Sequence, residues 1–118
     1  MASSLSSTGK NVMLNHLAGL AVYASIHSAV PDDTGSSEIS GGSPAYARLP
    51  VTWNTAAMGA ISVTNSPITF DIPAGTTVIG VGLWSAVSGG DFYGFYDLIH
   101  QTFPSQGTYP LNAAAIQL

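Results

Sequence analysis

Three histidines could supply a general base or metal ligands, because imidazole does both near neutral pH. They are His16, His27 and His100. No two of them stand at a ligand spacing such as H-x-H or H-x-x-x-H, and the chain has no cysteine to complete a zinc site. We therefore expect structural or surface histidines, with no metal and no cofactor.

The acidic residues are poorly spaced for catalysis. Asp91 and Asp97 would lie on the same face of one strand but about 20 Å apart, whereas the two carboxyl groups of a glycosidase are roughly 5–9.5 Å apart. Asp32, Asp33 and Glu38 share one loop, yet they do not follow the D-x-[DN]-x-[DN]-G pattern of a calcium loop. The sequence thus predicts neither a carboxylate dyad nor a calcium site.

Two motifs associated with enzymes are incomplete. The run G-V-G-L-W-S at residues 80–85 lacks the last glycine of a dinucleotide fingerprint and lies inside an expected strand, not at a strand-to-helix turn. No G-x-S-x-G elbow occurs among the many serines. We expect no catalytic residues and predict that the protein is not an enzyme.

An aromatic cluster is the best candidate for a functional surface. Since neighbouring residues on a strand point to opposite faces, one part of the cluster should be buried and the other partly exposed. The exposed part could contact another protein or stack on a sugar. The candidate partner-binding residues are Trp84, Phe92, Tyr93, Phe95 and Tyr96.

The composition favours assembly with other protein surfaces. Charged residues make up 7% of the 118 residues, against about 25% in an average soluble domain. Lys10 and Arg48 are the only cations and the net charge is −4, so nucleic acid is an improbable partner. Residues 11–29 are apolar but interrupted by polar side chains, so we expect no membrane span and no signal peptide.

The chain should begin with a helix. Apolar residues recur at helical spacing from Met13 to Ala21, which predicts a helix over about residues 10–20, capped by Ser7 or Thr8. This helix is expected to lay one apolar stripe on a sheet.

The rest of the chain is predicted to form short strands. Turn residues predict one hairpin after residues 61–64 and a second around S-G-G-D at 88–91. Strands are expected at residues 22–28, 46–55, 61–64, 68–72, 76–84, 92–98 and from 108 to 111 or as far as 116. This pattern predicts a mainly β fold, a single β-sandwich or barrel-like domain over residues 1–118 with one short N-terminal helix.

Two features depart from a regular sheet. Residues 31–45 are rich in Ser, Gly, Asp and Thr, which predicts an exposed loop. Gly80 and Gly82 share one face of their strand and leave it bare, so that Trp53, Phe92 or a neighbouring subunit could cover it. The partner surface is expected to begin at this bare strip.

The order of motifs carries a resemblance to a known family. These motifs are T-G-K-N, A-V-Y-A-S-I-H, G-G-S-P-A-Y-A-R, V-T-W, I-T-F-D-I-P-A-G-T-T-V, V-G-L-W-S-A, G-G-D-F-Y-G and Q-G-T-Y-P-L. The chain resembles small β-rich virion proteins of tailed bacteriophages that infect actinobacteria, which are named as head decoration, minor tail or tail fibre proteins. The resemblance covers nearly the whole chain.

The resemblance implies a structural protein of the virion, first assembled in the cytoplasm of the host bacterium. Our leading expectation is a capsid decoration protein that binds the major capsid protein on the outer surface and reinforces it. The alternative is a tail fibre or minor tail protein that contacts other virion subunits and host-surface carbohydrate. A homo-oligomer such as a trimer would hide apolar surface without using charge.

Overall fold

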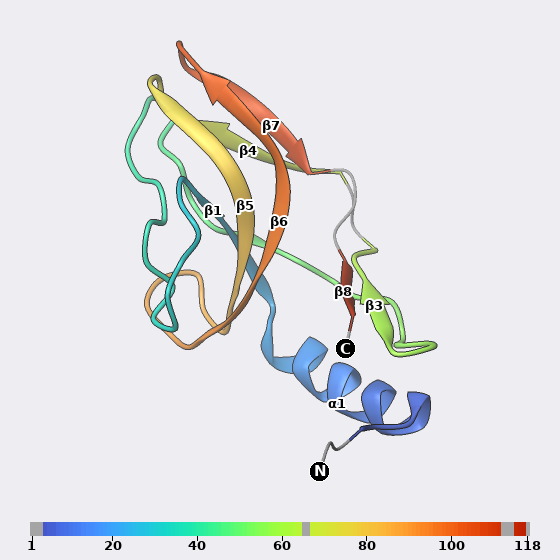
Figure 1. The fold of residues 1–118 in the computed structure, drawn as a ribbon. Coiled ribbons are helices and arrows are strands. Elements are labelled where there is room, and N and C mark those ends of the chain that lie inside the picture. Colours follow the sequence, from blue (N-terminus) through green and yellow to red (C-terminus); the bar gives the residue numbers. More distant parts are fainter. Residues whose placement is uncertain (1–3, 65–66, 112–114, 118) are drawn as a thin grey trace.

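The computed structural model describes residues 4–64, 67–111 and 115–117. The fold is mainly β with one helix, which confirms the fold class predicted from the sequence. Figure 1 shows the strands gathered on one side of the N-terminal helix. The elements are, in order, α1 (Ser7–Leu20), β1 (Tyr23–His27), β2 (Leu49–Pro50), β3 (Ala60–Ser62), β4 (Ile68–Ile72), β5 (Thr76–Trp84), β6 (Phe92–Phe103), β7 (Gly107–Leu111) and β8 (Ala115–Gln117).

The N-cap of helix α1 lies one residue before the predicted caps. Ser6 is the N-cap, and its hydroxyl oxygen accepts a hydrogen bond of 3.1 Å from the backbone N–H of Gly9. This bond satisfies one of the amide groups that the first turn leaves without a helical partner. The cap therefore falls on Ser6, and not on Ser7 or Thr8.

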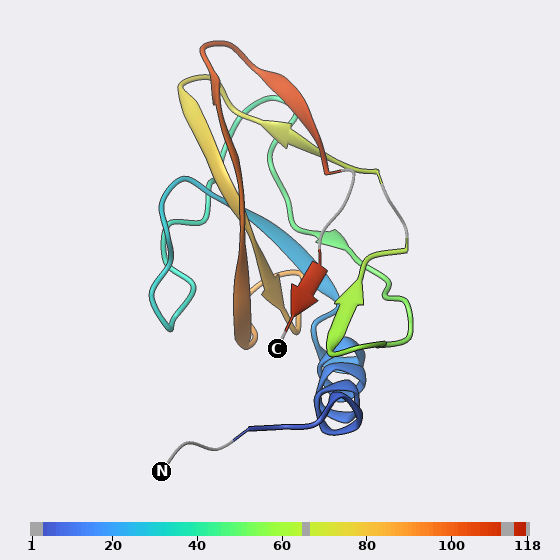
Figure 2. The same cartoon turned by 45° about the vertical axis from the view of Figure 1, so that its right-hand side comes forward.

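Helix α1 buries less than the expected apolar stripe. Leu14 is its one buried residue, while Met13 is 52% exposed. The helix lies against β3 at one end of the molecule, as the two ribbon views agree, and it does not cover the large sheet (Figures 1 and 2). The prediction of a helix with its apolar side on a sheet was correct, but the sheet is the two-stranded β3–β8 pair, because Leu14 is buried with Ile61 of β3.

The largest sheet contains four antiparallel strands in the order β2-β1-β5-β6. The β5–β6 hairpin that the S-G-G-D turn predicts forms one side of this sheet, with β6 at the edge. Strand β6 is longer than predicted, because its pairing with β5 continues as far as Phe103, which pairs with Thr76. Two register shifts along this pair bend the long strand.

Two predictions about the smaller strands were wrong. Strands β3 and β4 do not form a hairpin with each other: β4 pairs with β7, and β3 pairs with β8. The turn proposed between them includes residues 65 and 66, which lie outside the described residues. The strand expected over residues 46–55 is reduced to β2 and a single bridge between Trp53 and Val63, since Pro50 cannot donate to a ladder.

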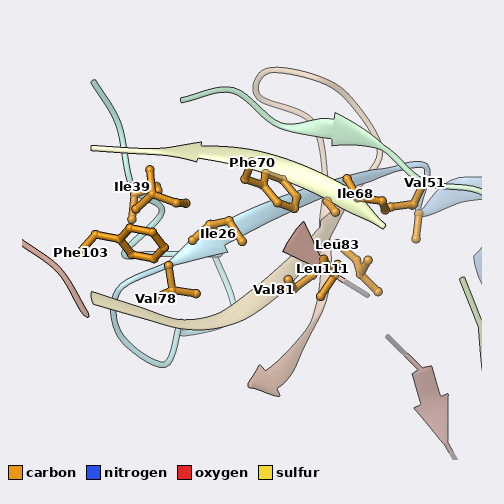
Figure 3. Packing of buried hydrophobic residues seen from close by; sticks show 13 residues of the cluster. Ile26, Ile39, Val51, Ile68, Phe70, Val78, Val81, Leu83, Phe103 and Leu111 are labelled. Carbon is orange, nitrogen blue, oxygen red and sulfur yellow. The ribbon is translucent and has the colours of Figure 1, made fainter. Parts of the chain in front are cut away.

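The core lies between the four-stranded sheet and the β4–β7 pair. Figure 3 shows Ile26 of β1 and Val81 of β5 beneath Phe70 of β4. Phe70 and Ile26 are fully buried, as are Ile72 and Val78. The face of the sheet that carries these side chains is called the inner face below.

The opposite face of the same sheet, the outer face, is covered by the segment between β1 and β2 (Figures 1 and 2). The predicted bare strip on β5 is therefore covered by the chain itself: a Cβ atom at Gly80 would overlap the ring of Phe95, and one at Gly82 would overlap His27. Neither Trp53 nor Phe92 fills this role. Residues 31–45 are thus only partly the exposed loop that we predicted, because Ile39 is buried in the core.

Candidate functional site

The aromatic cluster is divided between the two faces of the sheet, as predicted, but a register shift between Leu83 and Trp84 breaks the period of two and places Phe92 on the same face as Phe95. On the outer face, the rings of Phe92 and Phe95 lie 6.0 and 5.9 Å from the ring of His27, centre to centre. Tyr93 and Tyr96 pack instead against the inner core. All four of these phenylalanine and tyrosine residues are half-buried.

Trp84 is the buried member of the cluster, with 7% of its surface exposed. Its indole N–H donates a hydrogen bond of 2.8 Å to the hydroxyl oxygen of Ser25. Gly35 of the covering segment lies so close to the indole that a Cβ atom there would overlap it. Trp84 therefore holds the covering segment on the sheet and has little surface left for a partner.

Ser25 and His27 form a hydrogen-bonded pair beneath that segment. The distance from the Ser25 hydroxyl to Nε2 of His27 is 2.7 Å, and Nδ1 of His27 lies 2.8 Å from the carbonyl oxygen of Ser36. Because a carbonyl only accepts, Nδ1 carries the proton, and Nε2 accepts from Ser25. Burial lowers the pKa of His27, although the Ser36 bond and the Glu38 charge raise it, so the ring is held neutral.

A serine hydroxyl bonded to a histidine is also the arrangement of an activated nucleophile. Here both side chains have 0% exposure, so no substrate can reach the hydroxyl. The Ser25 oxygen also accepts from Trp84. We conclude that the pair is structural, and the sequence carried only a weak signal for it, namely two polar residues at i and i+2 on a strand.

Arg48 joins two loops to the outer face. Its guanidinium forms a bidentate ion pair with Glu38, in which Nε and Nη2 each lie 2.9 Å from a carboxylate oxygen. Nη1 donates to the carbonyl oxygens of Ala86 and Gly89 at 3.0 and 2.8 Å. The same guanidinium lies 3.7 Å above the ring of Trp84, within the range of a cation–π contact.

Glu38 is fixed from a second side by Tyr46. The Tyr46 hydroxyl donates to the carboxylate at 2.8 Å and accepts the backbone N–H of Ile26 at 2.9 Å. Burial alone would raise the pKa of Glu38, but the hydrogen bonds from Arg48 and Tyr46 and the charge of Arg48 lower it overall. Burial also raises the pKa of Tyr46. Glu38 is therefore a charged anchor for Arg48 and not a free calcium ligand.

The other residues considered for chemistry stand apart. Asp32 closes a local turn by accepting two hydrogen bonds from Thr34, which lower the pKa of its carboxyl group. Asp97 is exposed on β6, and its carboxylate lies 3.8 Å from the exposed ring of His100. Across residues 4–64, 67–111 and 115–117, no three His, Asp or Glu side chains gather as metal ligands would. In the same ranges, no helix has the length and hydropathy needed to cross a bilayer.

Shallow pockets lie on the surface of the described part of the chain, among them three of about 300 Å³ or more. One of about 370 Å³ lies beside Trp53, between α1 and the segment after β2. A second, of about 310 Å³, lies between β6 and β7 beside Tyr96 and Tyr109, and a third of about 300 Å³ lies beside Arg48. The sequence predicted none of them, because each is formed by residues that are distant along the chain.

Comparison with known proteins gives one family. The family model Gp80, described as "Podophage GP4 fiber I protein gp80", matches residues 4–118. No curated protein and no solved structure matches the chain.

Proposed function

Since the chain belongs to the Gp80 family of podophage GP4 fiber I proteins, we propose that it is a structural subunit of a phage tail fibre. The family match spans residues 4–118 and is the observation that carries the proposal. It makes the chain a phage structural protein and agrees with the predicted place in the virion.

The family corrects the order of the functions expected from the sequence. The resemblance placed capsid decoration first and a tail fibre second, and it named actinobacteria as hosts. The family description names a podophage fibre and supports neither a head decoration protein nor an actinobacterial host. We therefore put the tail fibre first.

The fold suits a structural subunit of a particle better than it suits a catalyst. The outer face is fixed by a continuous chain of hydrogen bonds from Ser36 to Trp84, and the Ser–His pair within it is closed to substrates. A rigid domain of this kind can be repeated along a fibre without a cofactor or a reaction.

Exposed apolar side chains indicate where neighbouring subunits would dock. Several lie at the helical end of the molecule, where Leu5, Val12, Met13 and Leu20 are 51%, 65%, 52% and 41% exposed. We propose that this end contacts other virion subunits, including further copies of the chain.

Of the five aromatic residues, the half-buried Phe92, Tyr93, Phe95 and Tyr96 remain candidates for partner binding.

Antibody labelling of intact particles tests the proposal. Gold particles directed against the chain should appear on fibres at the tail, and a particle reconstruction should fit the domain there. Label confined to the head would overturn the tail-fibre proposal and restore capsid decoration. Absence of the chain from purified particles would contradict a virion protein altogether.

A further inference from the structure

The pocket beside Trp53 has the composition of a site for an uncharged ligand rich in hydroxyl groups. Its volume is about 370 Å³, near the lower end of the roughly 300–1,000 Å³ of small-molecule sites. Asn15, Asn54 and Thr55 line it together with Trp53, and no described residue that lines it is charged. An acidic sugar or a phosphate would find no cation here, whereas a neutral polyol meets an aromatic ring and neutral polar groups.

The indole of Trp53 is held in a fixed position beside the pocket. Its N–H donates a hydrogen bond of 2.8 Å to the carbonyl oxygen of Ala21, directly after α1. The ring also packs against both buried apolar clusters of the domain. The C–H groups on one face of a sugar ring carry partial positive charge and pack well on the negative face of such a ring.

Two asparagine amides beside the indole are fixed in the same way. The carbonyl oxygen of Asn15 accepts the backbone N–H of Ala56 at 2.9 Å, so its NH₂ group is left to donate. The NH₂ group of Asn54 donates to the hydroxyl of Ser62 at 3.0 Å, so its carbonyl oxygen is left to accept. The pocket thus presents one donor and one acceptor, each oriented in advance, and sugar hydroxyls can satisfy both.

We propose that this pocket binds a neutral sugar residue, with the sugar ring against Trp53 and its hydroxyls bonded to Asn15 and Asn54. The binding stands on the pocket alone, while a role in contacting a host-surface glycan rests on the proposed fibre function. Tyr93 and Tyr96, which the sequence suggested for sugar stacking, do not line this pocket.

Fluorine NMR of the full chain tests the site directly. The protein is labelled with 5-fluorotryptophan and titrated with the methyl glycosides of glucose, galactose and N-acetylglucosamine, after a screen on an array of bacterial surface glycans. The chain has two tryptophans, so two signals are expected, and Trp53→Phe assigns them. The Trp53 signal should move with sugar while the Trp84 signal stays. No binding on the array and no movement at tens of millimolar sugar would overturn the proposal.

A matched pair of variants separates the pocket from the stability of the helix. Asn15→Asp keeps the acceptor for Ala56 and removes the free donor, so sugar binding should weaken about tenfold. Asn11→Asp makes the same change one turn earlier on α1, where Asn11 accepts the Gly59 N–H at 2.9 Å outside the pocket, and it should bind as the parent does. Equal weakening by both variants, or none by Asn15→Asp, would contradict the site. These measurements use purified protein and do not depend on the particle labelling. A negative sugar titration would contradict the pocket proposal alone, and a negative labelling result would contradict the fibre proposal alone.

Discussion

The two faces of the four-stranded sheet are stabilised in opposite ways. The inner face is apolar, with Phe70 and Ile72 of β4 packed on Ile26 and Val81. The outer face combines aromatic rings with polar side chains, and His27 and Ser25 on it are equally buried. The outer face is stable because, in the described part of the chain, each buried polar side-chain atom has a hydrogen-bond partner. Leaving such a group without a partner would cost much stability.

The difference teaches how much each face tolerates. Apolar packing is the sum of many small contacts. The stability lost in an inner-face substitution therefore depends on how many buried atoms, and how many of their contacts, are removed. The outer face depends on a few shared groups, because Arg48 alone contacts Glu38, Trp84 and two loop carbonyls. Loss of one such group leaves several other buried groups without a partner.

The inner face should give the largest single effect. Phe70→Ala removes a fully buried ring and should lower the free energy of unfolding by about 3–5 kcal/mol. Phe70→Leu is the milder variant if the first does not fold, with an expected loss of about 1 kcal/mol. Urea unfolding followed by circular dichroism measures both. Phe92→Leu on the outer face is the control, and a loss as large as that of Phe70→Leu would contradict the comparison.

Removing Arg48 should have the next largest effect. Breaking a buried ion pair costs about 3–5 kcal/mol, and because the Glu38 side chain keeps 22% exposure we expect about 2–3 kcal/mol for Arg48→Ala. The double variant Arg48→Met with Glu38→Gln should recover part of the loss, since no charge is left unpaired. Lys10→Ala, which removes the other cation, should change stability by less than about 0.5 kcal/mol. Equal effects of Lys10→Ala and Arg48→Ala would argue against the network.

The pH dependence of stability should give the smallest effect. The pKa of His27 in the folded chain lies below its ordinary value of 6.5, so between those two values the unfolded chain binds more protons than the folded one. Stability should therefore fall as the pH drops below about 6.5. Glu38 adds a second loss below about 4.5, because its folded pKa is also lowered.

Urea unfolding at a series of pH values from 8 to 5 measures the His27 effect. His27→Gln should flatten the decline in stability below pH 6.5, whatever its effect on absolute stability. His16→Gln is the matched control, since His16 is exposed on α1, and it should keep the parent's profile. A decline that persists unchanged in His27→Gln would mean that another group causes it.

Local patterns predicted the elements with the strongest periodicity. Strand β5 has the predicted bounds, Thr76–Trp84, and the hairpin to β6 follows from a turn with two glycines at positive φ. Pairings between distant segments were missed or misassigned, as with β4, whose partner is β7 and not β3. A turn motif predicts only that the chain reverses direction. It does not predict which strand the next strand will pair with.

By itself, the sequence determined the mainly β class and the N-terminal helix, because period and turn chemistry act over a few residues. It also indicated that the aromatic residues divide between two faces, but the register shift beside Trp84 decided which ring lies on which face. Only the tertiary structure decided that a polar segment covers the outer face, that His27 and Ser25 are buried together, and that Trp53 meets Asn15 and Asn54 at one pocket. Those arrangements depend on hydrogen bonds between segments far apart in the chain, whose partners are chosen when the sheet closes and buried polar groups must be satisfied.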